Sequence, residues 1–224
     1  MKVSAIILAA GKRTRMKSAL PKVLHQICGR PLVQYAVDSV NGLGIEQPVV
    51  VVGHGAEQVR AALGTQVIFA QQEQQLGTGH AVLCAQNALP ADADLVLVTS
   101  ADMPLFTPET LQALLASQQE NSGPISMLSV VAQDARGFGR VVRGSDGSVQ
   151  AIVEEAQASA EILAIDELNV GAYCFNAGWL WGALQRIPIS PKGEYYLTDV
   201  VALAVSEGLR VEAIRVADEG ETLG

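Results

Sequence analysis

Basic residues, cysteines and long apolar runs are all scarce in this sequence. Fifteen Lys and Arg residues stand against 23 Asp and Glu residues, and the net charge of −8 argues against nonspecific nucleic-acid binding. No apolar run approaches the length of a membrane span, and the first one is too short for a signal peptide. The cysteines, Cys28, Cys84 and Cys174, are odd in number and widely spaced, which favours reduced thiols that fill the core. We therefore expect a cytoplasmic protein without nucleic-acid or membrane partners.

Apolar residues make up 49% of the 224 residues, enough to bury the core of one large domain. In the first half, short apolar runs alternate with segments of helical periodicity. The strands expected there span residues 3–8, 48–52, 66–70 and 95–99, and the helices span 32–43, 55–63 and 79–88. This alternation predicts an α/β fold with a mostly parallel sheet and helices on both faces. Short strands and glycine turns after about residue 120 predict a β-rich second half.

The first expected strand ends at Leu8 in a small, basic loop, LAAGKRTRMKSALPK, which closes at Lys22. Its first residues, Ala9 to Gly11, are small enough for a base or phosphate to approach the backbone. Loop N–H groups and the cations that follow could meet the oxygens of a polyphosphate. The spacing matches neither GxGxxG nor GxxxxGK[ST]. A polyphosphate site and a solvated basic loop are about equally good interpretations of these residues alone.

A polar loop, QQEQQLGTGH, follows the expected strand at 66–70. Its amide side chains could recognise the donor and acceptor edge of a base. Thr78 could instead cap the helix that follows, and the two interpretations are compatible. His80 belongs to the start of that helix and has no partner in the sequence, so it is weak evidence of catalysis.

Carboxylates stand at two further strand ends. Asp102 follows the strand at 95–99 and is not needed as a helix cap, because Thr107 supplies that cap. We favour a magnesium ligand at this position, since Mg²⁺ takes one or two carboxylates together with phosphate oxygens and water. Glu154 and Glu155 follow a strand at 149–153, and adjacent strand residues point to opposite faces. At most one of this pair can face a site.

Several segments, in this order, carry a resemblance: LAAGKRTRMKSALPKVLH, QQLGTGHA, GFGRVV, IVEE, LNVGAYCFN and GEYYLTDVVALA. Together they resemble the uridyltransferase domain of the bacterial bifunctional enzymes that acetylate glucosamine 1-phosphate and make UDP-N-acetylglucosamine. The resemblance covers essentially the whole chain. The first motif marks the wider sugar-nucleotidyltransferase superfamily, and QLGTGHA with GEYYLTD makes the narrower match specific.

The resemblance implies a Rossmann-like fold of the nucleotide-diphospho-sugar transferase type with a β-rich sugar-binding lobe. Residues 1–120 would form the nucleotide half and residues 121–224 the sugar-phosphate half of a single domain. UTP and N-acetylglucosamine 1-phosphate would be the substrates and Mg²⁺ the cofactor, used in UDP-N-acetylglucosamine biosynthesis for cell-wall precursors. Arg15 and Lys22 would be catalytic. The nucleotide would contact Leu8, Ala10, Gly11, Lys22, Gln72, Gly77 and Thr78, the sugar phosphate would contact Gly139, Glu154, Asn169, Tyr196 and Thr198, and Asp102 would bind the metal.

Three departures from the family pattern stand out. Arg13 replaces a usual Gly, and Ser100-Ala101 replace a usual Tyr-Gly before Asp102. The sequence printed here ends at Gly224, before the Asn expected as second metal ligand and before the β-helix acetyltransferase domain through which such enzymes trimerise. If that Asn is absent, we expect weak Mg²⁺ binding and low turnover, and a chain of this length could be monomeric.

Two other functions are compatible with the sequence. The first is another nucleotidyltransferase of the superfamily, although the Asp-Ala-Ala-Arg-Pro of the 4-diphosphocytidyl-methylerythritol enzymes is missing. Molybdenum-cofactor guanylyltransferases usually have Leu-Ala-Gly-Gly where this chain has LAAG. The second is a catalytically silent nucleotide-binding module. Retention of Arg15, Lys22 and Asp102 favours an active enzyme over that module.

Overall fold

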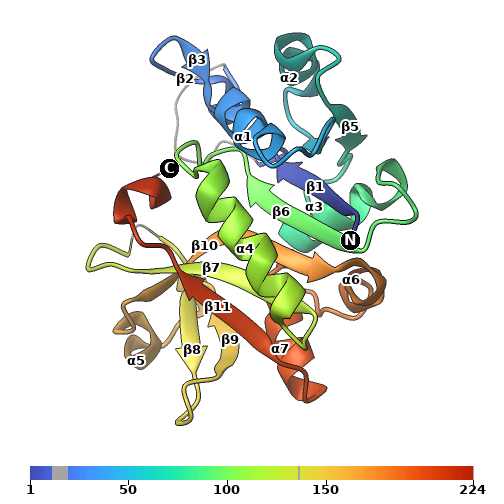
Figure 1. Ribbon diagram of the computed structural model, residues 1–224. Coiled ribbons are helices and arrows are strands. Elements are labelled where there is room, and N and C mark those ends of the chain that lie inside the picture. Colours follow the sequence, from blue (N-terminus) through green and yellow to red (C-terminus); the bar gives the residue numbers. More distant parts are fainter. Residues whose placement is uncertain (12–19, 136, 224) are drawn as a thin grey trace.

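The computed structural model describes residues 1–11, 20–135 and 137–223 as one nine-stranded sheet and a small hairpin, with helices on both faces of the sheet (Figure 1). The strands are β1 (Val3–Leu8), β2 (Gln26–Ile27), β3 (Arg30–Pro31), β4 (Val49–Val52), β5 (Ile68–Gln71), β6 (Leu95–Ser100), β7 (Ile125–Val131), β8 (Arg140–Arg143), β9 (Val149–Val153), β10 (Glu167–Asn176) and β11 (Val211–Arg215). The α-helices are α1 (Leu32–Asn41), α2 (Ala56–Leu63), α3 (Thr78–Cys84), α4 (Pro108–Glu120), α5 (Ala160–Leu163), α6 (Ala177–Leu184) and α7 (Asp199–Ser206). Short 3₁₀ helices span Lys22–Leu24, Gln86–Ala88, Glu155–Gln157 and Glu219–Thr222.

The main path through the sheet has the strand order β11-β7-β10-β6-β1-β4-β5. Strand β1 lies between β6 and β4 and is parallel to both, and β5 continues the parallel set beyond β4. All four residues of β4 are buried, because helices cover both faces of this part of the sheet. The predicted mostly parallel sheet with helices on both faces is confirmed, and the strands end together at one edge.

The second half of the chain adds its strands to the same sheet. Strand β10 pairs antiparallel with both β6 and β7, β11 is parallel to β7, and β8 and β9 extend from β10. The predicted β-rich second half is therefore confirmed, and it is continuous with the parallel half. The register of β10 shifts between Asn169 and Tyr173, where Gly171 has a φ of +76°. A left-handed glycine of this kind allows the strand to bulge beside the cavity described below.

The core consists of two apolar layers separated by the sheet. Alternate residues of β1 enter different layers, as the two-residue period of a strand requires. Ala5 and Ile7 pack in the layer covered by α1, α2 and α4, and Ile6 packs in the layer covered by α3, α6 and α7. Figure 1 shows α4 crossing the front of the sheet and α3 behind the sheet. Together the two layers bury both faces of the sheet.

The cysteines occupy three different environments. Cys174 is buried in the core as expected, and Cys84 is half-buried. Cys28 is exposed and has a φ of +50° in the β2–β3 hairpin, so the expectation that it fills the core is wrong. None of the helices in the described ranges is both long and apolar enough to span a membrane.

Candidate active site

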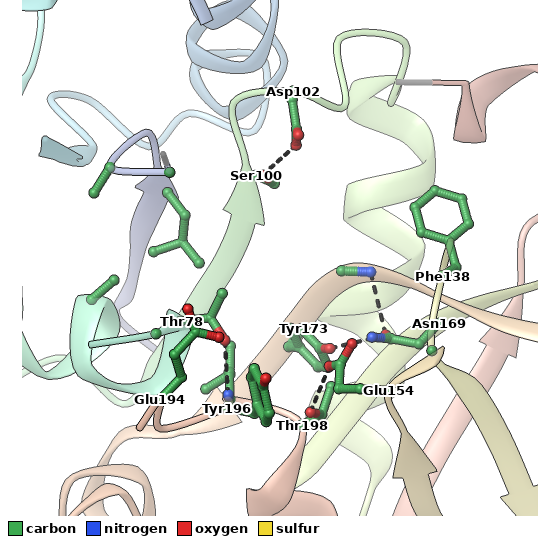
Figure 2. A pocket seen from close by; sticks show the side chains of 18 of the residues that line it. Thr78, Ser100, Asp102, Phe138, Glu154, Asn169, Tyr173, Glu194, Tyr196 and Thr198 are labelled. Atoms are coloured by element: carbon green, nitrogen blue, oxygen red, sulfur yellow. Dashed lines mark hydrogen bonds between the residues drawn. The ribbon is translucent and has the colours of Figure 1, made fainter. Parts of the chain in front are cut away.

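A cavity of about 440 Å³ opens at the carboxyl ends of the parallel strands. Residues from both halves of the chain line it, and Figure 2 shows Thr78 at the left, Asp102 at the top, and Glu154 and Asn169 at the right. A smaller cavity of about 110 Å³ adjoins it and shares Gly11 and Asp102 in its lining. In an α/β sheet this edge is the usual position of a ligand.

Asp102 lies just beyond β6 and forms an ion pair with a lysine from the start of the chain. Lys22 Nζ lies 2.8 Å from Asp102 Oδ2, and Ser100 Oγ donates to Oδ1 at 2.5 Å. Burial by itself raises the pKa of Asp102, but the hydrogen bonds from Lys22 and Ser100 outweigh it and hold the pKa below its usual value. Thr107 caps α4 by accepting from the Thr110 N–H at 3.2 Å, so Asp102 has no capping role. An ionised carboxylate therefore faces both cavities.

The loop between β5 and α3 is held by the buried amide of Gln72. Its Nε2 donates to the Gly77 carbonyl at 3.0 Å and lies 3.0 Å from His80 Nδ1. Gly77 has a φ of +99°, and a Cβ there would lie 2.5 Å from the Tyr195 carbonyl oxygen. Glycine is therefore required at this position, both for its conformation and for the close approach of the second backbone.

That second backbone belongs to the GEYYLTD motif, which binds the LGTG segment directly. The Tyr195 N–H donates to the Leu76 carbonyl at 2.7 Å, and the Gly79 N–H donates to the Tyr195 carbonyl at 2.8 Å. Thr78 Oγ1 accepts from the Leu197 N–H at 2.9 Å. The interpretation of Thr78 as a helix cap is wrong, because α3 starts after Gly77 without a side-chain cap and the threonine hydroxyl serves the other motif.

Only Glu154 of the Glu154-Glu155 pair lines the cavity, as predicted, although Glu155 begins a 3₁₀ helix and does not continue the strand. Glu154 lines the cavity and accepts from Thr198 Oγ1 at 2.8 Å. Burial raises the pKa of Glu154, and the Thr198 hydrogen bond only partly opposes that shift. Glu155 faces away and lies 3.4 Å from the buried guanidinium of Arg140. One carboxylate of the pair is thus available to a ligand.

The bulge of β10 contributes an amide to the same wall. Tyr173 Oη donates to Asn169 Oδ1 at 2.9 Å, and the Gly171 N–H donates to the same oxygen at 3.3 Å (Figure 2). Burial raises the pKa of Tyr173, so its hydroxyl keeps its proton as a donor. These two donors orient Asn169 and leave its amide N–H groups for the cavity.

The structure brings nearly all of the residues proposed from the sequence to one place. The main cavity is lined by Leu8, Ala10, Gly11, Gln72, Gly77, Thr78, Asp102, Gly139, Glu154, Asn169, Tyr196 and Thr198. Lys22 lines the smaller cavity. Arg15 and Arg13 belong to residues 12–19, which lie outside the described residues.

The residues of the cavity wall that sequence reasoning missed include Gln75, Phe138, Tyr173 and Glu194. Gln75 and Glu194 stand inside motifs that were recognised, so their polar side chains were the available signal. Tyr173 lies four residues after Asn169 on one strand, a spacing that places both on the same face. Phe138 stands inside the GFGRVV segment, but an aromatic residue in a glycine-rich turn is not specific for any ligand.

A comparison with families of known proteins matches residues 5–169 to the family described as "MobA-like NTP transferase domain". The chain belongs to this family. The match spans β1 to the first part of β10 and thus includes both sides of the cavity. The mostly parallel sheet with helices on both faces is consistent with such a domain.

Curated relatives extend the similarity beyond the MobA-like match to the rest of the chain. The chain is 48% identical over 221 residues to the "Bifunctional protein GlmU" of Exiguobacterium sibiricum, covering 98% of this chain and 49% of that protein. It is 44% identical over 224 residues to the protein of the same name from Heliobacterium modesticaldum, covering 100% and 49%. For the Geobacillus thermodenitrificans protein the identity is 45% over 221 residues, covering 98% and 48%. The chain spans about half the length of the curated relatives it matches.

Proposed function

We propose that this chain transfers UMP from UTP to N-acetylglucosamine 1-phosphate, giving UDP-N-acetylglucosamine and pyrophosphate. One observation carries the proposal. The QLGTGHA and GEYYLTD motifs, which distinguish the uridyltransferases within their superfamily, bind each other through Leu76, Thr78 and Tyr195 at the wall of one cavity. The sequence similarity to GlmU proteins over at least 98% of the chain supports the same assignment.

The reaction needs charge neutralisation and positioning more than proton transfer. The phosphate monoester of the sugar has a second pKa of about 6, so at neutral pH it is mostly ionised and needs no general base. It attacks the α-phosphate of UTP, a new P–O bond forms, and pyrophosphate leaves with the electrons of the broken bond. Cationic side chains that meet the developing charge supply the stabilisation that such a transfer requires.

Each side of the cavity has a proposed role. Lys22 meets phosphate oxygens as a point charge, and Arg15 adds a forked donor, as the family resemblance implies. The segments around Gly11 and Gln72 receive the nucleotide. On the other side, Gly139, Glu154, Asn169, Tyr196 and Thr198 receive the sugar phosphate, with carboxylate and amide groups suited to sugar hydroxyls.

Asp102 is the proposed magnesium ligand. Its ionised carboxylate, beside the Ser100 hydroxyl, is the hard oxygen donor that Mg²⁺ requires. The described residues contain no group of three His, Cys, Asp or Glu side chains that could cage a metal. A single carboxylate fits Mg²⁺, which completes its shell with substrate phosphates and water. When bound there, the ion would neutralise phosphate charge.

The decisive experiment is pyrophosphate release by the purified chain with UTP, Mg²⁺ and N-acetylglucosamine 1-phosphate. Parallel reactions use CTP or GTP, and glucosamine 1-phosphate or other hexose phosphates. We expect release with the UTP and N-acetylglucosamine pair, at least tenfold above every other pair. A different preferred pair would replace the proposed substrates, and nucleotide binding without any release would support a silent module instead.

We further propose that the 224-residue chain acts as a cytoplasmic monomer. Light scattering after size exclusion should give a mass near 23.5 kDa. A mass two or three times larger would contradict the proposal.

A further inference from the structure

His80 is a half-buried residue in the first turn of α3 that the proposed reaction does not use. In the described part of the chain its ring has two polar contacts, one with Gln72 and one with Cys84. Its Nδ1 lies 3.0 Å from Gln72 Nε2, and Cys84 Sγ lies 3.8 Å from its Nε2. The contact with Gln72 links this histidine to the cavity, because Gln72 lines it and His80 does not.

The orientation of the Gln72 amide follows from its neighbours. The Gly77 carbonyl, 3.0 Å away, can only accept a hydrogen bond, so the NH₂ end of the amide must face it. The second hydrogen of the same nitrogen then points to His80 Nδ1, which accepts only if the ring is neutral and carries its proton on Nε2. Both amide hydrogens are thereby committed within the protein, and the amide oxygen is left for a ligand.

Two further neighbours lie beside the ring and the Gln72 backbone. Burial raises the pKa of the Cys84 thiol, which therefore stays protonated beside the imidazole. The Cys84 sulfur lies 3.9 Å from Nδ1 and 3.8 Å from Nε2, so this contact does not select between the two ring tautomers. Gln75 Nε2 donates to the Gln72 carbonyl at 3.2 Å and holds the backbone of the same residue.

We propose that His80 is a positioning residue that makes the site prefer uracil to cytosine, by holding the Gln72 amide so that it offers only its oxygen to the base. This proposal rests on the proposed nucleotide site. Uracil carries an N–H at ring position 3, whereas cytosine carries a lone pair there. An acceptor that meets the N–H gains a hydrogen bond, and an acceptor that meets the lone pair leaves both groups unsatisfied.

The test compares kcat/KM for UTP and for CTP in three variants. His80→Leu removes the acceptor, and we expect the UTP-to-CTP ratio to fall about tenfold, mainly through the KM for UTP. His80→Asn can present an amide oxygen in place of Nδ1 and should restore most of the ratio. Cys84→Ala removes the other contact of the ring and should keep the ratio of the parent protein. An unchanged ratio in His80→Leu would overturn the proposal.

A double-mutant cycle separates positioning from a general structural effect. In a Gln72→Met background, the further change His80→Leu should leave the UTP-to-CTP ratio unaltered, because the amide through which it acts is gone. A full additional loss in that background would show that His80 acts by another route and would contradict the proposal.

Two further measurements test the role of His80. The first needs no variant, and the second needs no sugar substrate. Nitrogen-15 NMR of the three histidines in the parent chain should show His80 neutral, with the proton on Nε2, and an Nδ1-protonated ring would refute the inference. Calorimetric titration with UTP or CTP alone measures base preference without a sugar phosphate. Preference for UTP in this titration, combined with no pyrophosphate release, would reject the proposed reaction and leave the role of His80 intact.

Discussion

The Lys22–Asp102 pair lies at the cavity, whereas the Arg143–Glu167 pair lies where β7, β8, β10 and β11 meet. Arg143 holds both carboxylate oxygens of Glu167 at 2.6 Å, and Ser129 Oγ donates to one of them at 2.8 Å. Arg215 adds a fourth strand to the cluster at 3.6 Å. The side chain of Glu167 is only 6% exposed, whereas those of Lys22 and Asp102 are 43% and 35% exposed.

The comparison shows that the surroundings of an ion pair decide whether it stabilises the fold or stays open to a ligand. Burial tends to raise the pKa of both carboxyl groups, and in both cases hydrogen bonds outweigh burial and lower it. Glu167 is surrounded by partners from three neighbouring strands, so it joins the sheet and has little room for a ligand. Asp102 has one cation and one hydroxyl beside open space, so its carboxylate stays accessible to a metal ion. Three predictions test this contrast.

The largest effect is expected for Asp102→Asn. Loss of the charge should lower kcat by about 10²–10³-fold, because the proposed Mg²⁺ site would lose its anionic ligand. The free energy of unfolding should change by less than about 1 kcal/mol, since the pair is half exposed. Pyrophosphate release and urea denaturation measure the two quantities.

The matched control for Asp102→Asn is Asp92→Asn, which removes the carboxylate of the exposed Lys2–Asp92 pair. It should alter neither quantity. Loss of stability without loss of turnover in Asp102→Asn would reverse the roles assigned to the two ion pairs.

Glu167→Gln should produce the opposite pattern. Removing one partner leaves the guanidinium of Arg143 without its anion, and we expect a loss of about 3 kcal/mol in the free energy of unfolding. Turnover per folded molecule should stay within about twofold of the parent value, since Glu167 does not line the cavity. Urea denaturation at pH 7, with Glu57→Gln as the control at an exposed carboxylate, measures the loss.

The dependence of this loss on pH gives a second check. The folded-state pKa of Glu167 lies below its usual value, so its stabilisation is present above the unfolded-state pKa of about 4.3. It is lost as the pH falls through the lower, folded-state pKa. The gap between the two proteins should therefore close in acid, and a gap that widened there would contradict the argument.

Local patterns in the sequence predict much of this fold. The all-apolar run Val49–Val52 indicates a buried parallel strand, and that is its state in the sheet. The sequence predicts the ends of helices less accurately than their presence, as the helix expected at 79–88 shows. The α-helix ends at Cys84, and the 3₁₀ helix Gln86–Ala88 follows it. The hydrogen bonds there join residues three positions apart, as in the Ala88 N–H to Ala85 carbonyl bond. The insertion of β10 between β6 and β7 depends on pairing between distant strands, which no local pattern encodes.

For the site residues too, local patterns were informative and contacts between distant parts of the chain were not. The expected strand ends predict that Leu8, Gln72 and Asp102 lie at one edge, because parallel strands of one sheet end together. All three line the cavity. The bond between Thr78 and Leu197 joins residues 119 positions apart, so the threonine was assigned to a nearer, local partner. Glu167 gave no signal at all, since its importance comes from side chains of three other strands.

The smallest effect is expected for Glu154→Gln, which extends the comparison to a carboxyl whose pKa is raised. Burial disfavours its ionised form, so the charge weakens the fold above the raised pKa, and this cost disappears as the pH falls through that value. The glutamine oxygen can still accept from Thr198, and we expect a gain of about 1 kcal/mol at pH 7 that vanishes below about pH 4. The KM for the sugar phosphate should rise in the same variant, while Glu161→Gln, at an exposed carboxylate, should change neither quantity. Destabilisation by Glu154→Gln would mean that this buried carboxylate holds the fold together as Glu167 does, rather than being kept charged for a ligand.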